Sequence, residues 1–284
     1  MTSIAVTGAT GQLGQLVIAQ LKQQVDHKNI IALVRNPAKA AALGVSARQG
    51  DYAQPEALEA ALTGVNTLVL ISSSEVGQRA AQHANVIQAA KNNGVQHIIY
   101  TSLLHADSSP LSLAQEHRAT EADLKASGIA YTILRNGWYT ENYLGALGTA
   151  LEHGALIGSA AQGRIASATR QDFAEAIVKV ATGTGHANTT YELAGDTAWT
   201  LSDLAAEVSS QSGKNVVYTD LPEAEYAKAL AGFGLPEGLA AAIASWDVGA
   251  AQGALYSDDR TLSRLIGRPT TPLKQAVADA LQAL

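Results

Sequence analysis

The sequence of 284 residues contains no cysteine. The chain therefore has no disulfide, no thiolate nucleophile and no cysteine metal site. Its seven histidines show no metal-binding spacing such as H-E-x-x-H, so we expect no metal. The lack of cysteine is also typical of a reducing compartment, and we expect the protein to be cytoplasmic.

The sequence also lacks a basic excess and a long apolar run. Lys and Arg number 19 against 25 Asp and Glu, which gives a formal net charge of −6. Surfaces that bind nucleic acid are usually strongly basic, so we expect no nucleic-acid partner. No apolar stretch approaches the ~18 residues of a membrane span, so we expect no membrane insertion. The first apolar run begins at Ile4 and has the pattern of a strand, so we expect no signal peptide.

The clearest motif that is present lies near the start of the chain. The apolar run 4–6 predicts a buried strand, Gly8–Gly14 reads G-x-x-G-x-x-G, and apolar residues follow at helical spacing. A strand that turns through glycines into a helix presents backbone N–H groups to an anion. We therefore predict dinucleotide binding here, with a tight turn as the alternative. The expected contacts are Gly8, Ala9, Thr10, Gly11, Gln12 and Leu13.

The next predicted strand, residues 29–34, ends at Arg35. Proteins that prefer NAD usually carry an acid about 20 residues past the glycines, where it holds the ribose 2′-hydroxyl. A guanidinium at this place suits a 2′-phosphate instead. The predicted cofactor is therefore NADP(H), and the alternative is that Arg35 is an ordinary surface cation.

Strand and helix patterns alternate through the first half of the chain. This repeat predicts an α/β fold, a Rossmann-type doubly wound parallel sheet that binds ligands at the carboxyl ends of its strands. We expect a Rossmann domain over residues 1–135. Residues 136–284 are expected to form cleft loops and a small, mostly helical C-terminal lobe that partly completes the sheet. Further strands are expected over 45–49, 67–71, 97–102, 130–135, 190–194 and 215–219, and helices over 55–62, 78–92, 116–126, 172–181 and 200–212.

Longer segments resemble the NmrA-like branch of the atypical short-chain dehydrogenases. They are VTGATGQLG from Val6, LVRNPAKA from Leu33, ISSSEVGQRAAQH from Ile71, YTSLLHADSSPLSLAQEH from Tyr100, TILRNGWYTENYL from Thr132, YELAGDTAWTLSDLAAE from Tyr191 and LSRLIGRPTTPL from Leu262. Within that branch the sequence is most similar to bacterial NADPH-dependent quinone oxidoreductases, with triphenylmethane reductase as a relative. The resemblance implies a Rossmann fold, NADP(H) in a cleft and quinones as hydride acceptors.

The resemblance also implies further contacts to the cofactor. These are Ser72, Ser73 and Ser74 after the fourth strand and, on the nicotinamide side, Asn136, Gly137, Trp138, Tyr139 and Asn142. Asp51 lies where related folds place residues beside the adenine, and its alternative role is to start the helix at Pro55. For Asn136 the alternative is a cap of the strand-to-loop turn. For the aromatic residues it is a place in the core.

Standard short-chain dehydrogenases move a proton with a Tyr-x-x-x-Lys pair, and this pair is absent. Its positions hold Leu113 and His117, and Ser102 occupies the serine position. A ketone that takes hydride becomes a basic alkoxide that needs a proton donor or oxyanion stabilisation. A quinone gives a weakly basic hydroquinone anion that water can protonate. The expected reaction is therefore hydride transfer from NADPH to a small planar quinone-like acceptor, for which positioning suffices.

His117 is the one titratable group that we expect near the reacting atoms. Its ordinary pKa of about 6.5 would permit proton delivery, and the alternative is a helix-face histidine bonded to a loop carbonyl. Two alternatives to quinone reduction stay open: reduction of cationic triphenylmethane-type dyes, and a redox sensor that binds NADP⁺ and NADPH with different affinity. A homodimer is also left open.

Overall fold

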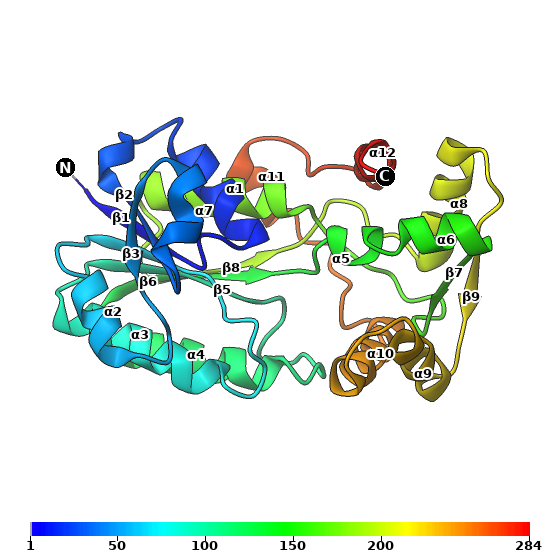
Figure 1. Cartoon of the computed structure of the whole chain (residues 1–284), viewed down its shortest axis with the longest axis horizontal. Coiled ribbons are helices and arrows are strands. Elements are labelled where there is room, and N and C mark those ends of the chain that lie inside the picture. The colour runs from blue at the N-terminus through cyan, green and yellow to red at the C-terminus, as the bar shows by residue number, and fades with distance from the viewer. Residues whose placement is uncertain (1) are drawn as a thin grey trace. The chain divides into compact units, whose positions relative to one another are not determined.

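The structure, a computed structural model, describes residues 2–284 and contains a seven-stranded parallel sheet (Figure 1). The strand order is β3-β2-β1-β4-β5-β6-β8, and each neighbouring pair is parallel. The strands are β1 (Ile4–Thr7), β2 (Ile30–Val34), β3 (Ser46–Gln49), β4 (Thr67–Leu70), β5 (His97–Leu103), β6 (Ala130–Asn136) and β8 (Thr189–Leu193). The order reverses between β1 and β4, where doubly wound sheets bind their ligands. The predicted Rossmann-type sheet is confirmed.

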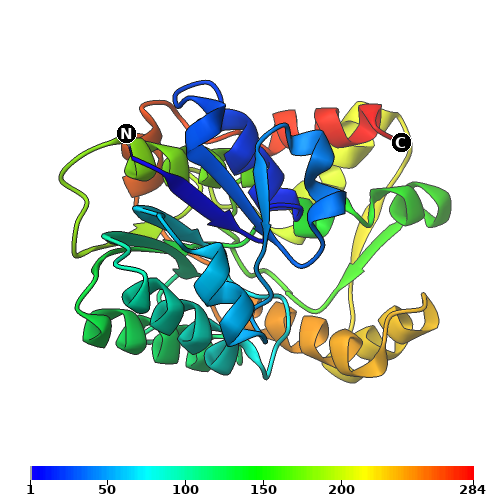
Figure 2. The ribbon, with the colours of Figure 1, turned by 60° about the vertical axis from the view of Figure 1, so that its left-hand side comes forward.

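Helices cover both faces of this sheet. Figures 1 and 2 show one group of helices on each face. The first group is α1 (Gln12–Leu21) and α7 (Arg170–Thr182), and the second is α2 (Pro55–Ala61), α3 (Arg79–Asn92) and α4 (Ala114–Ser127). All residues of β1, β2 and β4 are buried, as continuous apolar strands between two helical layers should be. The edge strand β3 is polar and partly exposed.

The chain divides into two compact units, and each is assembled from three segments. The first unit contains the sheet and its five helices and consists of the residues up to Asp107, Leu113–Asn136 and Arg170–Leu193. The short 3-10 helices η1 (His27–Asn29) and η2 (Pro37–Leu43) also belong to it. Among residues 2–284, no helix is both long and apolar enough to cross a membrane.

The second unit is mostly helical and consists of Ser108–Ser112, Gly137–Thr169 and Ala194–Leu284. Its two strands, β7 (Ala155–Gly158) and β9 (Val217–Asp220), pair in parallel. Its helices are α5 (Glu141–Leu144), α6 (Leu147–His153), α8 (Leu201–Ser212), α9 (Glu223–Gly232), α10 (Glu237–Ala251), α11 (Thr261–Ile266) and α12 (Leu273–Gln282). Helix α8 opens with a capping box, in which Asp203 N donates to Thr200 Oγ1 at 3.1 Å. Helices α9 and α10 lie side by side (Figure 1).

Candidate functional site

The glycine loop between β1 and α1 has the backbone of an anion-binding turn. Gly8 has a φ of +58°, in the left-handed region that favours glycine. A Cβ at Gly14 would lie 2.3 Å from the carbonyl oxygen of Gly8, so α1 can approach the loop only with glycine there. Among the described residues, no side chain caps α1, and its first turn contains no acid. Its positive N-terminal end is therefore open to an anion.

The six loop residues predicted to contact the cofactor fall into two groups, buried and exposed. Ala9 and Leu13 are buried and fix the loop to the core. The other four predicted residues are exposed: Gly8, Thr10, Gly11 and Gln12. The Gly11 N–H donates to the Gly8 carbonyl at 2.8 Å, which closes the loop as a tight turn.

Thr7 links β1 to β4, the two strands between which the strand order reverses. The glycine motif did not indicate this role. Its hydroxyl donates to the carbonyl of Val69 at 3.2 Å and accepts from the Ile71 N–H at 2.9 Å. The hydroxyl of Tyr52 donates to the Ile71 carbonyl at 2.8 Å. The carboxyl ends of β1 and β4 are therefore held in register where the glycine loop begins.

Arg35 and Asp51 follow β2 and β3. The guanidinium of Arg35 is 76% exposed, and its Nη1 lies 3.4 Å from Glu75 Oε1. Oδ1 of Asp51 accepts from the Ala53 N–H at 3.0 Å, within the turn that precedes α2. Asp51 therefore stabilises the turn before α2, whereas the N-cap of that helix is Gln54.

The serines after β4 are tied to neighbouring elements of the same unit. The Ser72 N–H donates to Thr101 Oγ1 at 2.8 Å, and the Ser73 N–H donates to His83 Nε2 at 2.9 Å. Ser74 is exposed. This predicted segment therefore has a backbone fixed by β5 and α3.

His117 lies on α4 inside the first unit and is only 4% exposed. Its Nε2 is 3.2 Å from Arg79 Nη1, and its Nδ1 is 2.7 Å from the hydroxyl of Tyr100. Because a guanidinium only donates, Nε2 accepts and the ring carries its proton on Nδ1. Burial, assisted by the charge of Arg79, lowers the pKa of His117 to about 3. The geometry favours a structural helix-face histidine, bonded to side chains and not to a loop carbonyl.

His83 is a second buried histidine whose two ring nitrogens are both engaged. The sequence analysis gave it no role. It accepts the Ser73 N–H on Nε2, and its Nδ1 lies 2.9 Å from Thr120 Oγ1. Burial and then the charge of Arg79 lower the pKa of His83 to about 3. In the sequence, His83 follows Arg79 by four residues. In a helix this spacing places both side chains on the same side, so it could have indicated that the two are neighbours.

Ser102 and Arg135 are also engaged within the first unit. The Ser102 hydroxyl donates to Glu121 Oε1 at 2.6 Å. Nε and Nη2 of Arg135 donate to the two oxygens of the same carboxylate at 2.9 and 2.6 Å. The serine that occupies the dehydrogenase position thus supports a buried bidentate ion pair.

Asn136 is the last residue of β6 and is 4% exposed. Within the part of the chain that the structure describes, neither its Oδ1 nor its Nδ2 has a hydrogen-bond partner. Its backbone carbonyl accepts from the Leu104 N–H at 2.9 Å, which continues the pairing of β6 with β5, and its side chain caps no turn. A buried amide without partners costs about 1–3 kcal/mol, which makes this side chain a candidate for binding a polar ligand group.

The other residues of the predicted nicotinamide-side segment belong to the second unit. Gly137 is buried, and the half-buried ring of Trp138 meets the Trp246 ring edge-on at 5.7 Å. Tyr139 pairs in parallel with Ala168, and its carbonyl accepts from the Asn142 N–H at 3.0 Å. Within its own unit Trp138 therefore has an aromatic partner, which is consistent with its alternative place in a core.

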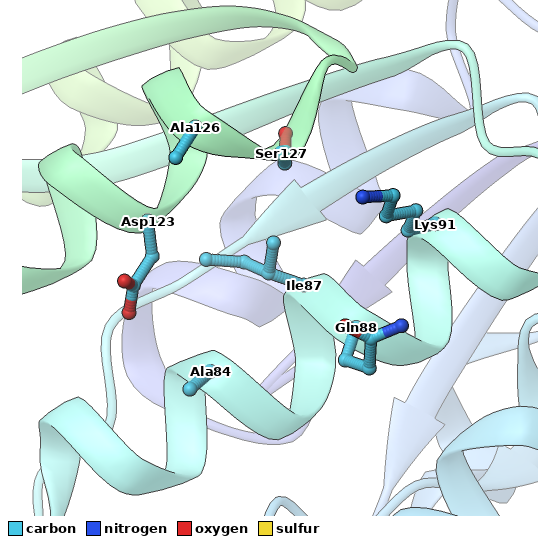
Figure 3. A pocket seen from close by; sticks show the side chains of 7 residues that line it. All are labelled: Ala84, Ile87, Gln88, Lys91, Asp123, Ala126 and Ser127. Carbon is cyan, nitrogen blue, oxygen red and sulfur yellow. The ribbon is translucent and has the colours of Figure 1, made fainter.

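A surface groove of about 240 Å³ lies elsewhere, between α3 and α4 (Figure 3). Lys91 lines it from α3 and Asp123 from α4, and none of the predicted site residues contributes to it. Among residues 2–284, no group of three acidic or histidine side chains could hold a metal ion. The candidate site is therefore the set of loops at the carboxyl ends of β1, β2, β4 and β6.

A doubly wound parallel sheet with a glycine loop at its switch point defines a dinucleotide-binding protein. The chain belongs to the NAD(P)H-binding family, whose model matches residues 8–184. It is 59% identical over 278 residues to quinone oxidoreductase 2 of Escherichia coli, a match that covers 97% of each chain. These findings confirm the family and the cofactor class predicted from the sequence.

Solved structures of relatives agree with this assignment. The NADPH-dependent quinone oxidoreductase of Escherichia coli, complexed with NADPH, superimposes with a TM-score of 0.95 at 58% identity, over 98% of this chain and 99% of that one. The Citrobacter triphenylmethane reductase complexed with NADP(H) has a TM-score of 0.95 at 41% identity, over 98% and 100%. The regulator NmrA shares the fold at a TM-score of 0.79 and 15% identity, over 99% and 96%. The predicted NmrA-like resemblance is confirmed.

Proposed function

We propose that the protein is an NADPH-dependent reductase that transfers hydride to quinones. The observation that carries this proposal is the match to quinone oxidoreductase 2 along 97% of both chains. Reduction of triphenylmethane dyes is the second candidate, because the Citrobacter reductase is 41% identical.

The residues of the first unit fit NADPH. The open N-terminal end of α1 would receive the pyrophosphate, and Arg35 would pair with the 2′-phosphate. The unpartnered amide of Asn136 would bind the carboxamide of the nicotinamide or a carbonyl of the acceptor. When bound, NADPH supplies the hydride. We assign the planar acceptor to the second unit, with the aromatic rings of Trp138 and Tyr139 as its flat contact surface.

The protein's own residues leave protonation of the product to water. Leu113 is buried at the position of the dehydrogenase tyrosine and cannot move a proton. His117 already uses both ring nitrogens, and its pKa of about 3 keeps it neutral. The chain thus suits acceptors whose reduced form is weakly basic, as a hydroquinone anion is.

The experiment that tests the function follows NADPH oxidation by its absorbance. Benzoquinones, naphthoquinones and a cationic triphenylmethane dye serve as acceptors, and each assay is repeated with NADH. Fast turnover of quinones with NADPH supports the proposal, and turnover of the dye alone supports the second candidate. Tight NADPH binding without any turnover contradicts both and favours a redox sensor.

A cytoplasmic location and a homodimer are further parts of the proposal. A reducing compartment supplies NADPH and suits a chain without cysteine. Fractionation of cells and sedimentation of the purified protein test the two separately.

A further inference from the structure

We infer that Glu75 narrows the preference for NADPH over NADH, because its carboxylate competes with a 2′-phosphate for the guanidinium of Arg35. The inference rests on the proposed use of NADPH. Nη1 of Arg35 lies 3.4 Å from Glu75 Oε1, and the two side chains are 76% and 50% exposed. The cation expected to hold the phosphate therefore already has an anionic partner.

The carboxylate of Glu75 is anchored by the protein. Its Oε2 accepts from Gln82 Nε2 at 2.8 Å, and its backbone N–H donates to Ser73 Oγ at 3.1 Å. Ser73 Oγ in turn donates to Gln82 Oε1 at 2.5 Å. Gln82 is only 7% exposed, so this carboxylate is fixed beside Arg35 by a buried side chain of α3.

The expected change in NADPH affinity follows from the solvent exposure of Arg35 and Glu75. Exposed ion pairs change an equilibrium by a factor of up to about five, and salt weakens them. A bound 2′-phosphate would have to share the guanidinium of Arg35 with the carboxylate of Glu75. NADH carries no such phosphate, so Glu75 lowers the affinity for NADPH more than that for NADH and narrows the preference between them.

The test is to measure the dissociation constants of NADPH, NADH, adenosine 2′,5′-bisphosphate and AMP for Glu75→Gln by calorimetry. Glutamine keeps an oxygen for the Gln82 amide while removing the charge. At low ionic strength we expect about three-fold tighter binding of the two 2′-phosphate ligands and unchanged binding of the other two. Asp123→Asn, an exposed charge on α4 away from the site, is the control for net charge.

A second arm repeats the comparison in an Arg35→Ala background. There, removal of the Glu75 charge should change NADPH affinity much less, because the contested guanidinium is gone. Unchanged or weaker NADPH binding in Glu75→Gln overturns the inference, as does an equal gain for all four ligands or an undiminished gain without Arg35. The wild-type protein tests the proposed function separately: equal affinity for NADPH and NADH would contradict the NADPH proposal itself.

Discussion

Two buried histidines are each held in one neutral tautomer by a donor that cannot accept. The Ser73 N–H donates to His83, and the Arg79 guanidinium donates to His117. A positively charged ring would lose the acceptor nitrogen that each donor requires. Burial, and then the charge of Arg79, lowers the pKa of each ring to about 3, against about 6.5 in an unfolded chain.

The histidine pair predicts loss of stability in acid. Because both folded pKa values are depressed, the stabilisation is present above pH ~6.5 and is lost as the pH falls from there toward 3. His117→Gln should lower the slope of unfolding free energy against pH by up to about 1.4 kcal/mol per pH unit between pH 6 and 4. Urea unfolding measured at several pH values checks this.

The same variant tests the proposed role of His117. If the ring is structural, the quinone rate of His117→Gln should keep the pH profile of the wild type. Loss of one limb of that profile, with stability unchanged, would instead identify His117 as the proton donor.

We predict that replacing Asn136 raises the stability of the unliganded protein and weakens ligand binding. Asn136→Leu removes two unpartnered buried atoms, so the unliganded protein should gain about 1 kcal/mol in unfolding free energy. Binding of NADPH should weaken about ten-fold, because a hydrogen bond to the ligand is lost. Urea unfolding and NADPH titration give the two numbers.

Asn93→Leu is the matched control for that change. The amide of Asn93 donates to the carbonyls of Glu59 and Ala89, both at 3.0 Å, so its loss should destabilise the fold without changing NADPH binding. If Asn136→Leu behaves in the same way as this control, its amide serves the fold alone.

At the scale of elements, the turn from β1 into α1 has the tightest steric constraint of the candidate site. Gly14→Ala would place a Cβ 2.3 Å from the Gly8 carbonyl and 2.7 Å from Ala9 Cα. Because backbone atoms cannot move aside, we expect a loss of about 3 kcal/mol or more and much weaker NADPH binding. Urea unfolding with and without NADPH measures both.

Gly148→Ala, in α6, is the control, because this helical glycine has space around it for a Cβ. Its added Cβ would meet only the end of the Leu284 side chain, at 3.7 Å. Alanine should leave stability unchanged or raise it by up to about 1 kcal/mol. Equal losses in the two variants would mean that the close approach of α1 is not what requires Gly14.

The elements themselves could largely be predicted from the sequence, because alternating apolar runs and helix starts are local signals. The helix expected over 200–212 forms as α8, and the strand expected over 190–194 forms as β8. The hydrogen bond between His83 and Thr120 could not be predicted, because it depends on the register of α3 against α4. The pair of Arg35 and Glu75 likewise joins loops after two different strands.

At the scale of the whole molecule, the sheet is assembled from distant segments. Helix α7 and strand β8 belong to the first unit, although 33 residues of the second unit, 137–169, precede them. A chain that ends at residue 135 lacks both elements, so β6 keeps β5 but loses its other neighbour β8, and α1 loses α7. We expect this truncated chain not to unfold cooperatively, whereas a chain that ends at residue 193 should do so. Thermal unfolding followed by circular dichroism compares them, and a cooperative transition in the shorter chain would contradict this reading of the sheet.

The packing of α7 on α1 also has a consequence for synthesis on the ribosome. Gln20 of α1 donates to the Gln171 carbonyl of α7, and the two helices cover each other's apolar sides. At about 5–20 residues per second, the roughly 150 residues between them take about 7–30 s to translate. During that interval the side of α1 that α7 later covers is without its partner in the nascent chain. Chaperones that bind short apolar helices would therefore have their longest opportunity at this early segment.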